Sequence, residues 1–159
     1  MVRSLQSEIK QTVPFRSLEE EAHLSIIRTA DLLMRSGAHL LKDHGLTQTQ
    51  YNVLRILRGA GAEGLPSGEV ADRMITREPD ITRLLDRMES RGWVHRRRDP
   101  GDRRVMRVWI TLAGHELTDR LDRPVAELLK QNLSHLGDAK LGDLSDLLGS
   151  VREVCKRSK

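Results

Sequence analysis

Arginine is concentrated in one segment of the chain, and its side chain defines the chemistry that the sequence is best equipped to perform. Residues 73–107 contain eleven arginines and six acidic residues, a local excess of +5, whereas the whole chain of 159 residues carries +4. A planar guanidinium presents its donors in a fixed fork, which fits phosphate oxygens and guanine edges better than an ammonium group does. Charge runs also occur on solvated faces. The segment nevertheless indicates a nucleic acid as the natural partner.

The sequence contains weaker indications of catalysis, of a cofactor or of a metal site than of nucleic-acid binding. No nucleophile with a base, no metal cage and no cofactor loop has the required spacing, so we expect no enzyme activity, no cofactor and no metal. The pair His115 and Asp119 approaches a metal site, but a second histidine would be needed at 119. Glycines 59, 61 and 64 match the dinucleotide fingerprint, but they follow a predicted helix, and we interpret them as a flexible turn.

An amphipathic helix carries the first group of basic residues. Ile81, Leu84, Leu85 and Met88 recur at helical spacing, which predicts an apolar face toward the core, and Gly92 ends the pattern. The opposite face is polar and basic. Together with the turn before the helix, it supplies six candidate contact residues, which are Arg77, Pro79, Asp80, Thr82, Arg83 and Arg87.

A short helix is predicted just before this one. Ser67 is placed to cap it, Val70 and Met74 give it an apolar side, and residues 75–77 form a turn into the next helix. Two short helices joined by a tight turn form a helix-turn-helix, whose second helix lies in the major groove of duplex DNA. On this interpretation the six candidate residues face DNA, and Ser67 contacts the DNA backbone.

A β-hairpin is predicted after the second helix. Apolar residues alternate along 106–110, Val94 opens the facing strand, and the sequence Asp-Pro-Gly-Asp at 99–102 supplies the turn. Five arginines, at 96–98 and 103–104, are predicted near the tip. A basic hairpin beside a recognition helix is a wing, able to reach phosphates or the narrow minor groove. The candidate wing contacts are Arg97, Arg98, Arg103 and Arg104.

A long helix is predicted on the N-terminal side of these elements. Residues 1–15 have little periodicity and are interpreted as an arm. Apolar residues then form a helical stripe from Leu18 to Leu41, which Gly45 can end. Thr47 and Gln50 have the spacing of a capping box and predict the start of another helix near residue 48.

Two more long helices are predicted on the C-terminal side. Thr111 is placed to cap the first, in which Pro124 predicts a kink or a break, and Asp138 is placed to cap the second. The expected fold is mainly α with a small β-hairpin: a winged helix-turn-helix with long N- and C-terminal dimerisation helices. We expect one domain over residues 1–159, with a DNA-binding region at 46–111 and a helical dimerisation region at 1–45 and 112–159.

Composition limits the cellular setting. The N-terminus lacks the apolar segment of a signal peptide, and no stretch approaches the eighteen or so apolar residues that cross a membrane. We therefore expect a cytoplasmic protein without a membrane partner. The single cysteine, Cys155, excludes an internal disulfide, and we interpret it as an incidental thiol rather than a redox sensor.

The segment from Ile81 to Leu117 carries the most specific pattern in the sequence, ITRLLDRMESRGWVHRRRDPGDRRVMRVWITLAGHEL. It resembles the multiple antibiotic resistance regulator (MarR) family of bacterial transcription factors, and the resemblance extends over nearly all of the chain from about residue 17. The D-x-R hallmark of that family's wing falls on Asp102–Arg104. By resemblance, Arg104 enters the minor groove or orients the wing, and Asp102, a further wing residue, holds it.

The resemblance also implies a mode of action. It implies a homodimer that binds a pseudo-palindromic operator in double-stranded DNA and, in most members, a repressor that a small molecule releases. The expected ligand is a small aromatic or phenolic compound, in particular an anion, in the crevice between the dimer helices and the winged part. The candidate ligand contacts are His39, Tyr51 and Arg55. The alternative is an interaction module that binds RNA or an acidic protein through its arginine-rich face.

Overall fold

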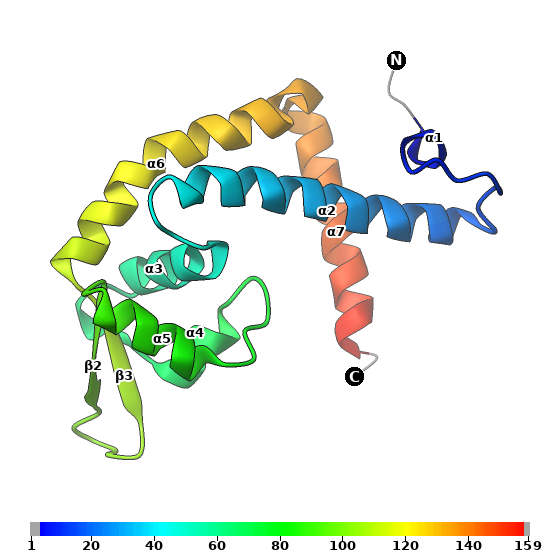
Figure 1. Cartoon of the computed structure of the whole chain (residues 1–159). Helices are drawn as coiled ribbons and strands as arrows, with labels where there is room; N and C mark the ends of the chain where they lie inside the picture. The colour runs from blue at the N-terminus through cyan, green and yellow to red at the C-terminus, as the bar shows by residue number, and fades with distance from the viewer. Residues whose placement is uncertain (1–3, 158–159) are drawn as a thin grey trace.

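Long helices from both ends of the chain flank a smaller region of short helices and strands in this computed structural model, which describes residues 4–157 (Figure 1). The ends of the two predicted terminal regions, residues 1–3 and 158–159, lie outside the described residues. The elements in chain order are α1 (Leu5–Glu8), α2 (Leu18–Lys42), α3 (Gln48–Ala60), η1 (Gly61–Glu63), β1 (Leu65–Pro66), α4 (Ser67–Asp72), α5 (Ile81–Ser90), β2 (Val94–Arg98), β3 (Met106–Ile110), α6 (Leu112–Leu133), η2 (Ser134–Leu136) and α7 (Gly137–Arg157).

Local capping signals place the ends of the first long helices. The Ser17 hydroxyl accepts a hydrogen bond from the Glu20 amide at the start of α2, and Gly45, with φ +70°, reverses the chain after it. The predicted capping box of α3 is confirmed, because the Thr47 hydroxyl accepts the Gln50 backbone amide at 3.2 Å and the Gln50 side-chain oxygen accepts the Thr47 amide at 2.9 Å. These short-range bonds fix where α2 stops and α3 begins.

The winged region, defined here as residues 46–111, holds most of the core. Fifteen apolar residues are buried among the described residues, and twelve of them lie in this region. They include Leu84, Leu85 and Met88 of α5, so the predicted apolar face of that helix is confirmed. The core positions α5 and the hairpin relative to each other, which is what a DNA-reading site requires.

The sheet has three strands in the order β1–β3–β2, one more than the predicted hairpin. In the hairpin, Val94 pairs with Ile110, while the two-residue β1 pairs its Leu65 with Val108. Gly64 makes this approach possible, because a Cβ there would lie 2.5 Å from the Val108 carbonyl oxygen. The predicted turn is present, with positive φ at Gly61 and Gly64, and Gly64 is buried against β3.

Three helix-end predictions need correction or refinement. Ser67 does not cap α4, because its hydroxyl donates instead to the Met106 carbonyl at 3.0 Å and Pro66 occupies the N-cap position. Asp138 lies inside the first turn of α7, which begins one residue earlier. Pro124 does not break α6, which runs continuously through it and curves in Figure 1.

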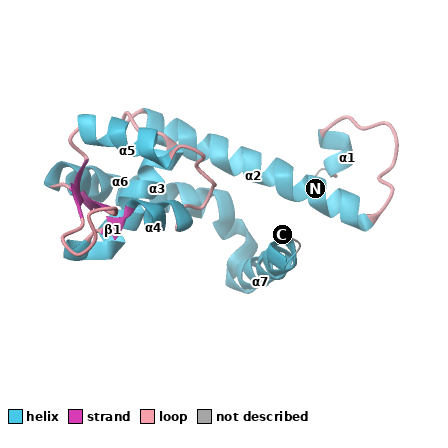
Figure 2. Ribbon diagram, turned by 90° about the horizontal axis from the view of Figure 1, so that it is seen from below, coloured by secondary structure: helices cyan, strands magenta, loops and turns pink. Residues whose placement is uncertain are grey.

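The two ends of the chain extend away from the winged region. In Figure 2, α2 reaches from the region of α3–α5 toward α1, and α7 lies to one side of it. The predicted N-terminal arm contains the single-turn helix α1, whose Glu8 pairs with Arg28 of α2 at 2.8 Å. Among residues 4–157, no helix has both the length and the apolar character that crossing a membrane requires.

Candidate nucleic-acid interface

The exposed face of α5 is anchored at its N-terminus by Asp80. The Asp80 carboxylate accepts the Arg83 backbone amide at 3.0 Å and pairs with the Arg83 guanidinium at 3.2 Å. The same residue therefore caps the helix and orients a side chain on its outer face. All six candidate residues of this helix and its preceding turn are exposed: Arg77, Pro79, Asp80, Thr82, Arg83 and Arg87.

Asp99 organises the turn of the wing. Its carboxylate accepts the backbone amides of Gly101 at 2.8 Å and Asp102 at 3.3 Å, and the Nε–H of Arg107 at 2.9 Å. The Gly101 amide, followed by the Arg107 guanidinium, holds the pKa of Asp99 below its ordinary value. The sequence predicts Asp99 in the turn, but it does not predict the hydrogen bond from Arg107, because Arg107 is eight residues away.

The D-x-R pattern of the wing forms a local hydrogen bond. The Asp102 carboxylate accepts the Arg104 backbone amide at 2.9 Å, while the Arg104 guanidinium makes no hydrogen bond or ion pair within residues 4–157. Asp102 thus shapes the backbone under Arg104 and leaves its side chain available. Arg97 and Arg103 are exposed in the same way, whereas Arg98 donates to the Arg103 carbonyl at 2.6 Å.

Arg96 does not belong to the basic tip, contrary to the sequence prediction. Its backbone amide and its guanidinium both donate to Glu89 of α5, and the guanidinium also donates to Asp86. The side chain is only 16% exposed. Burial opposes its charge, but the hydrogen bonds to Glu89 and Asp86 outweigh burial and raise the pKa of Arg96. The alternation of a strand explains the difference, because Arg96 shares the inward face with Val94.

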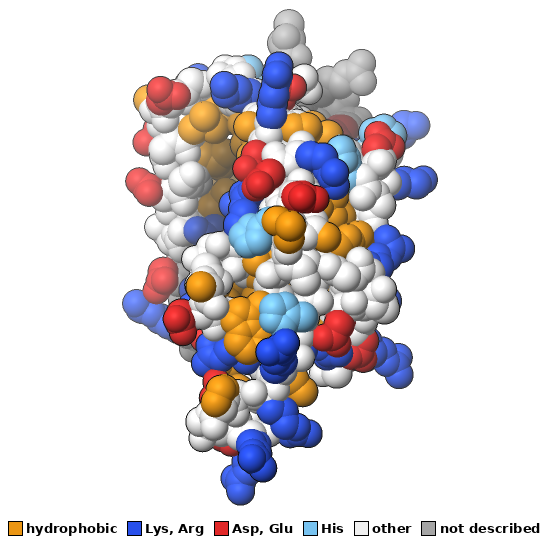
Figure 3. All heavy atoms as spheres, turned by 90° about the vertical axis from the view of Figure 1, so that its left-hand side faces the viewer, with side chains coloured by type: hydrophobic (Ala, Val, Ile, Leu, Met, Phe, Trp, Pro, Cys, Tyr) orange, Lys and Arg blue, Asp and Glu red, His pale blue; other side chains and the backbone are white. Residues whose placement is uncertain are grey.

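The arginines of the basic surface therefore fall into two groups, those that hydrogen-bond to other parts of the chain and those whose side chains are exposed. Arg96 joins the wing to α5, and Arg107 joins it to Asp99 and to the carbonyls of Glu63 and Gly64. Figure 3 shows the side of the molecule on which Lys and Arg side chains gather at the lower end, over the β2–β3 wing. This arrangement presents guanidinium groups beside an exposed helix, as a duplex DNA reader requires.

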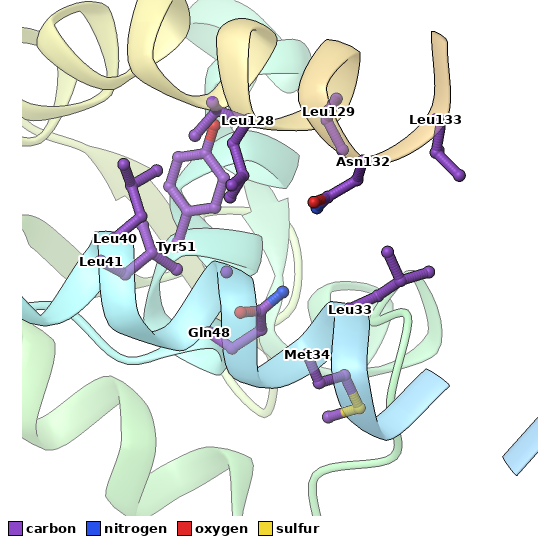
Figure 4. A pocket seen from close by; sticks show the side chains of 12 residues that line it. Leu33, Met34, Leu40, Leu41, Gln48, Tyr51, Leu128, Leu129, Asn132 and Leu133 are labelled. Atoms are coloured by element: carbon purple, nitrogen blue, oxygen red, sulfur yellow. The ribbon is translucent and has the colours of Figure 1, made fainter. Parts of the chain in front are cut away.

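A separate apolar pocket of about 200 Å³ lies between α2, α3 and α6 (Figure 4). Its walls are residues of α2 between 33 and 41, Gln48 and Tyr51 of α3, and residues of α6 between 125 and 133. Of the three candidate ligand residues, Tyr51 is in the wall, and His39 and Arg55 are not. Burial raises the pKa of Tyr51, so its hydroxyl keeps its proton.

An ion pair next to this pocket joins the winged region to α6. The Arg58 guanidinium of α3 donates to both carboxylate oxygens of Asp122, at 2.7 and 2.9 Å, and to Asp119 at 3.2 Å. The hydrogen bond from Arg58 holds the pKa of Asp122 below its ordinary value. Within residues 4–157, no group of three or more His, Cys, Asp or Glu side chains is placed to hold a metal ion.

Comparison with known proteins shows the family to which this fold belongs. The family model described as "MarR family" matches residues 46–106, which cover α3 to the start of β3. The crystal structure of a MarR transcription factor from Planctomyces limnophilus is 39% identical, with a TM-score of 0.66, over 86% of this chain and 98% of that chain. The chain belongs to the MarR family.

Other members of the MarR family extend the comparison. The structure of Sco3205 from Streptomyces coelicolor, solved in complex with DNA, is 25% identical over 90% of this chain and 91% of that chain, with a TM-score of 0.79. CouR from Rhodococcus jostii RHA1, solved with p-coumaroyl-CoA, is 27% identical over 86% of this chain and 95% of that chain, with a TM-score of 0.72. The first curated relatives are transcriptional regulators, and the chain spans only 60–65% of their length.

Proposed function

We propose that this MarR-family chain is a sequence-specific transcriptional regulator that binds double-stranded DNA as a homodimer. The observation that carries the proposal is the juxtaposition of an exposed, polar and basic α5 with a wing on which Arg97, Arg103 and Arg104 are exposed. A MarR relative of similar fold, Sco3205, was solved with DNA bound. A regulator of this kind is not an enzyme and acts in the cytoplasm, where chromosomal DNA is found.

The two basic elements are proposed to contact different grooves. Residues of α5 and its preceding turn lie in the major groove, with Arg83 oriented by Asp80 toward a base or a phosphate. The wing lies over the adjacent minor groove, where Arg104 extends from the turn that Asp102 shapes. Arg97 and Arg103 are proposed to contact phosphates. Ser67 is left out of the proposed contacts, because its hydroxyl already donates to the Met106 carbonyl.

The dimer is proposed to form through the helical region, residues 1–45 and 112–159, with residues 46–111 as the DNA-binding region. Helix α7 has no buried residue among those described, and large apolar side chains on α2 and α7 are exposed. Contiguous apolar surface of this kind marks an interaction site. A two-fold dimer would place two α5 helices about 34 Å apart, one turn of B-DNA, and so select an inverted repeat.

The pocket between α2, α3 and α6 is proposed to bind a small-molecule effector that releases a repressor from its operator. The pocket lies where α3 of the winged region meets α2 and α6, so an occupant contacts both regions of the chain. CouR, a relative of the same fold, was solved with an aromatic thioester, p-coumaroyl-CoA. A ligand that binds one orientation of the two regions more tightly would shift the population toward it.

Selection of duplexes from a random pool tests the DNA-binding proposal at physiological salt, where nonspecific binding is weak. We expect an enriched inverted repeat whose half-site centres are about ten base pairs apart. Arg104→Ala should weaken binding without altering the oligomeric state, and Arg83→Ala should also relax preference at one base position. Arg123→Ala, which removes an exposed arginine on α6, is the matched control. No enrichment of any duplex, together with binding to RNA or an acidic protein, would favour an interaction module instead.

A further inference from the structure

The wall of the pocket contains no charged side chain. Nine of the twelve residues that line it are aliphatic or glycine, and the other three, Gln48, Tyr51 and Asn132, are polar but uncharged. Moving a carboxylate or an ammonium group from water into such a site is costly unless an opposite charge and hydrogen bonds meet it. The wall therefore penalises an ionic ligand of either sign.

The charged groups nearest to Tyr51 lie outside the wall of the pocket. Arg58 is hydrogen-bonded to Asp119 and Asp122, so its guanidinium already has two carboxylate partners. Arg55 and, more weakly, Arg58 act electrostatically on Tyr51 in the direction opposite to Asp122, and Arg55 also lowers the pKa of Asp122. Because none of these side chains is in the wall, an anion inside the pocket would meet no direct cationic partner.

Three polar groups in the wall are arranged for hydrogen bonding to a neutral molecule. Tyr51 is 8% exposed, and its hydroxyl forms no hydrogen bond within residues 4–157. The Gln48 carboxamide lies against Gly37 of α2, where a Cβ would come within 2.9 Å of its oxygen. Asn132 donates to Ser36 at 3.3 Å, which leaves its carbonyl oxygen available. Figure 4 shows Asn132 pointing from α6 into the space toward α2, and the Tyr51 ring lying between α2 and α6 with its hydroxyl at α6 beside Leu128.

The pocket has room for one small ring. Its volume of about 200 Å³ exceeds the cavity of about 150 Å³ that accommodates benzene in an apolar protein interior. One ring with a short polar substituent therefore fits, and a larger ligand would have to extend through the open side of the pocket. Mostly aliphatic walls with a few polar groups also suit a ring that carries a single hydrogen-bond acceptor.

We infer that the pocket selects an uncharged single-ring ligand whose polar substituent accepts a hydrogen bond from the Tyr51 hydroxyl. The inference rests on the proposed function, since it names the chemical class of the effector. It differs from the sequence expectation of a small aromatic or phenolic anion contacted by His39, Tyr51 and Arg55, because only Tyr51 of these three lines the pocket. Tyr51, Gln48 and Asn132 replace them as the residues that determine specificity.

Three probes of nearly identical shape test this inference: benzamide, which is neutral, benzoate, which is anionic, and benzamidine, which is cationic at pH 7.5. Each is titrated into the full chain, and methyl resonances of Leu, Val and Met side chains are followed by NMR, with Met34 and Leu128 as reporters of the pocket. We expect benzamide to bind about tenfold or more tightly than either ion, because only the ions lose their hydration without a partner.

Two variants test which side chains determine the preference of the pocket for benzamide. Tyr51→Phe keeps the ring and removes the donor, so benzamide should bind about three- to tenfold more weakly. Arg55→Gln is the matched control on the same helix, one turn away and outside the wall, and should leave the order of the three probes unchanged. An unchanged affinity in Tyr51→Phe, or loss of binding in Arg55→Gln, would overturn the assignment.

The inference itself is overturned if benzoate or benzamidine binds as tightly as benzamide. It is also overturned if no probe shifts the pocket methyl resonances, because the pocket would then be filled in solution, for example by a second copy of the chain. Binding of the selected operator, measured by fluorescence anisotropy on the same samples, separates this failure from failure of the proposed function. Operator binding with a preference for benzoate would reject only the charge selectivity, whereas absence of operator binding would reject the regulator.

Discussion

The winged region and the helical region treat their apolar residues in opposite ways. Among residues 4–157, twelve of the fifteen buried apolar residues lie within 46–111, where Ile75 is the only exposed large apolar residue. The described part of the helical region has three buried apolar residues, Leu41, Leu117 and Leu121, and most of the exposed ones. The winged region therefore buries its apolar side chains within the chain, whereas α2 and α7 leave apolar side chains exposed that a further surface could cover.

The regions also differ in how they use charge. In the winged region, the Arg96–Glu89 pair joins the wing to α5, and the Arg107–Asp99 pair joins β3 to the turn of the wing. On the long helices, Arg35 with Asp31 and Arg123 with Glu127 are pairs within one helix, exposed to solvent. Such surface pairs contribute little. Ion pairs thus help to position the wing, whereas these two pairs on the long helices connect residues of a single helix.

Truncating the core of the winged region should give the largest loss of stability. Leu85→Ala removes a fully buried side chain and leaves a cavity, so the free energy of unfolding should fall by about 2–5 kcal/mol. Leu112→Ala, at a position 75% exposed at the start of α6, is the control and should change it by less than about 0.5 kcal/mol. Urea unfolding measures both. Equal losses of unfolding free energy would contradict the distinction between buried and exposed apolar residues.

Charging the outer face of α7 should dissociate the dimer without unfolding the winged region. Leu147 and Val151 are exposed on that helix, and each buried apolar side chain contributes about 1.5–3 kcal/mol. Leu147→Glu with Val151→Glu should therefore raise the dimer dissociation constant by about a hundredfold or more. Sedimentation equilibrium gives the constant, and Asp146→Glu on the same helix is the control. An unaltered constant would mean that α7 is not at the interface.

Removing the Arg96 guanidinium should loosen the wing. Arg96→Gln deletes the charged hydrogen bonds to Glu89 and Asp86, with an expected loss of about 1–3 kcal/mol of unfolding free energy. Because the wing is then poorly positioned, adding Arg104→Ala should weaken operator binding less than it does in the unaltered protein. Anisotropy titrations of the two single variants and the double variant give this coupling. Strictly additive effects would show that Arg96 does not act through the wing.

Acid should remove the stabilisation that Asp99 and Asp122 provide. Both have a folded-state pKa below the ordinary value, so their contribution is fully present above about pH 4 and is lost as the pH falls through the lowered pKa. The stability differences between the unaltered protein and Asp99→Asn or Asp122→Asn should thus be constant near neutrality and shrink below about pH 4. Urea unfolding at several pH values checks the trend, which a difference growing on acidification would contradict.

The smallest expected effects concern two helical glycines, one in each region. Gly59→Ala in α3 places a methyl group in open space and should stabilise the chain by about 0.5–1 kcal/mol. Gly37→Ala in α2 should gain less, because its Cβ would meet the Gln48 carboxamide. Thermal unfolding compares the two, and benzamide titration of Gly37→Ala should show weaker binding. An equal gain at both sites would show that the Gln48 amide moves aside freely.

The sequence predicted the elements of the proposed interface more fully than their interactions. The apolar stripe of α5, the capping box at Thr47 and the turn at 99–102 are short-range patterns, and the structure contains each of them. All six candidate residues of the recognition helix and its turn are exposed. Whether they contact DNA stays a prediction, since exposure is required for such contacts but does not establish them.

The errors of sequence analysis concern residues whose partners lie elsewhere in the chain. Ser67 has the composition of a helix cap, but its hydroxyl finds the Met106 carbonyl 39 residues later. Arg96 stands in a run of three arginines that look alike in sequence, and only packing of β2 against α5 turns it inward. Of the candidate ligand residues His39, Tyr51 and Arg55, only Tyr51 lines the pocket, which is formed by other faces of the helices that carry His39 and Arg55; whether any of the three contacts a ligand stays a prediction.

The sequence by itself determined the locally capped helix ends, such as the start of α3, which faces are apolar and where positive charge accumulates. These features depend on hydrogen bonds and periodicities within a few residues, so the amino-acid order contains them directly. Only the tertiary structure decided that β1 pairs with β3, that Arg96 and Arg107 hold the wing, and that the pocket is uncharged. Those outcomes depend on which distant side chains meet when the core closes, and local pattern does not encode that choice.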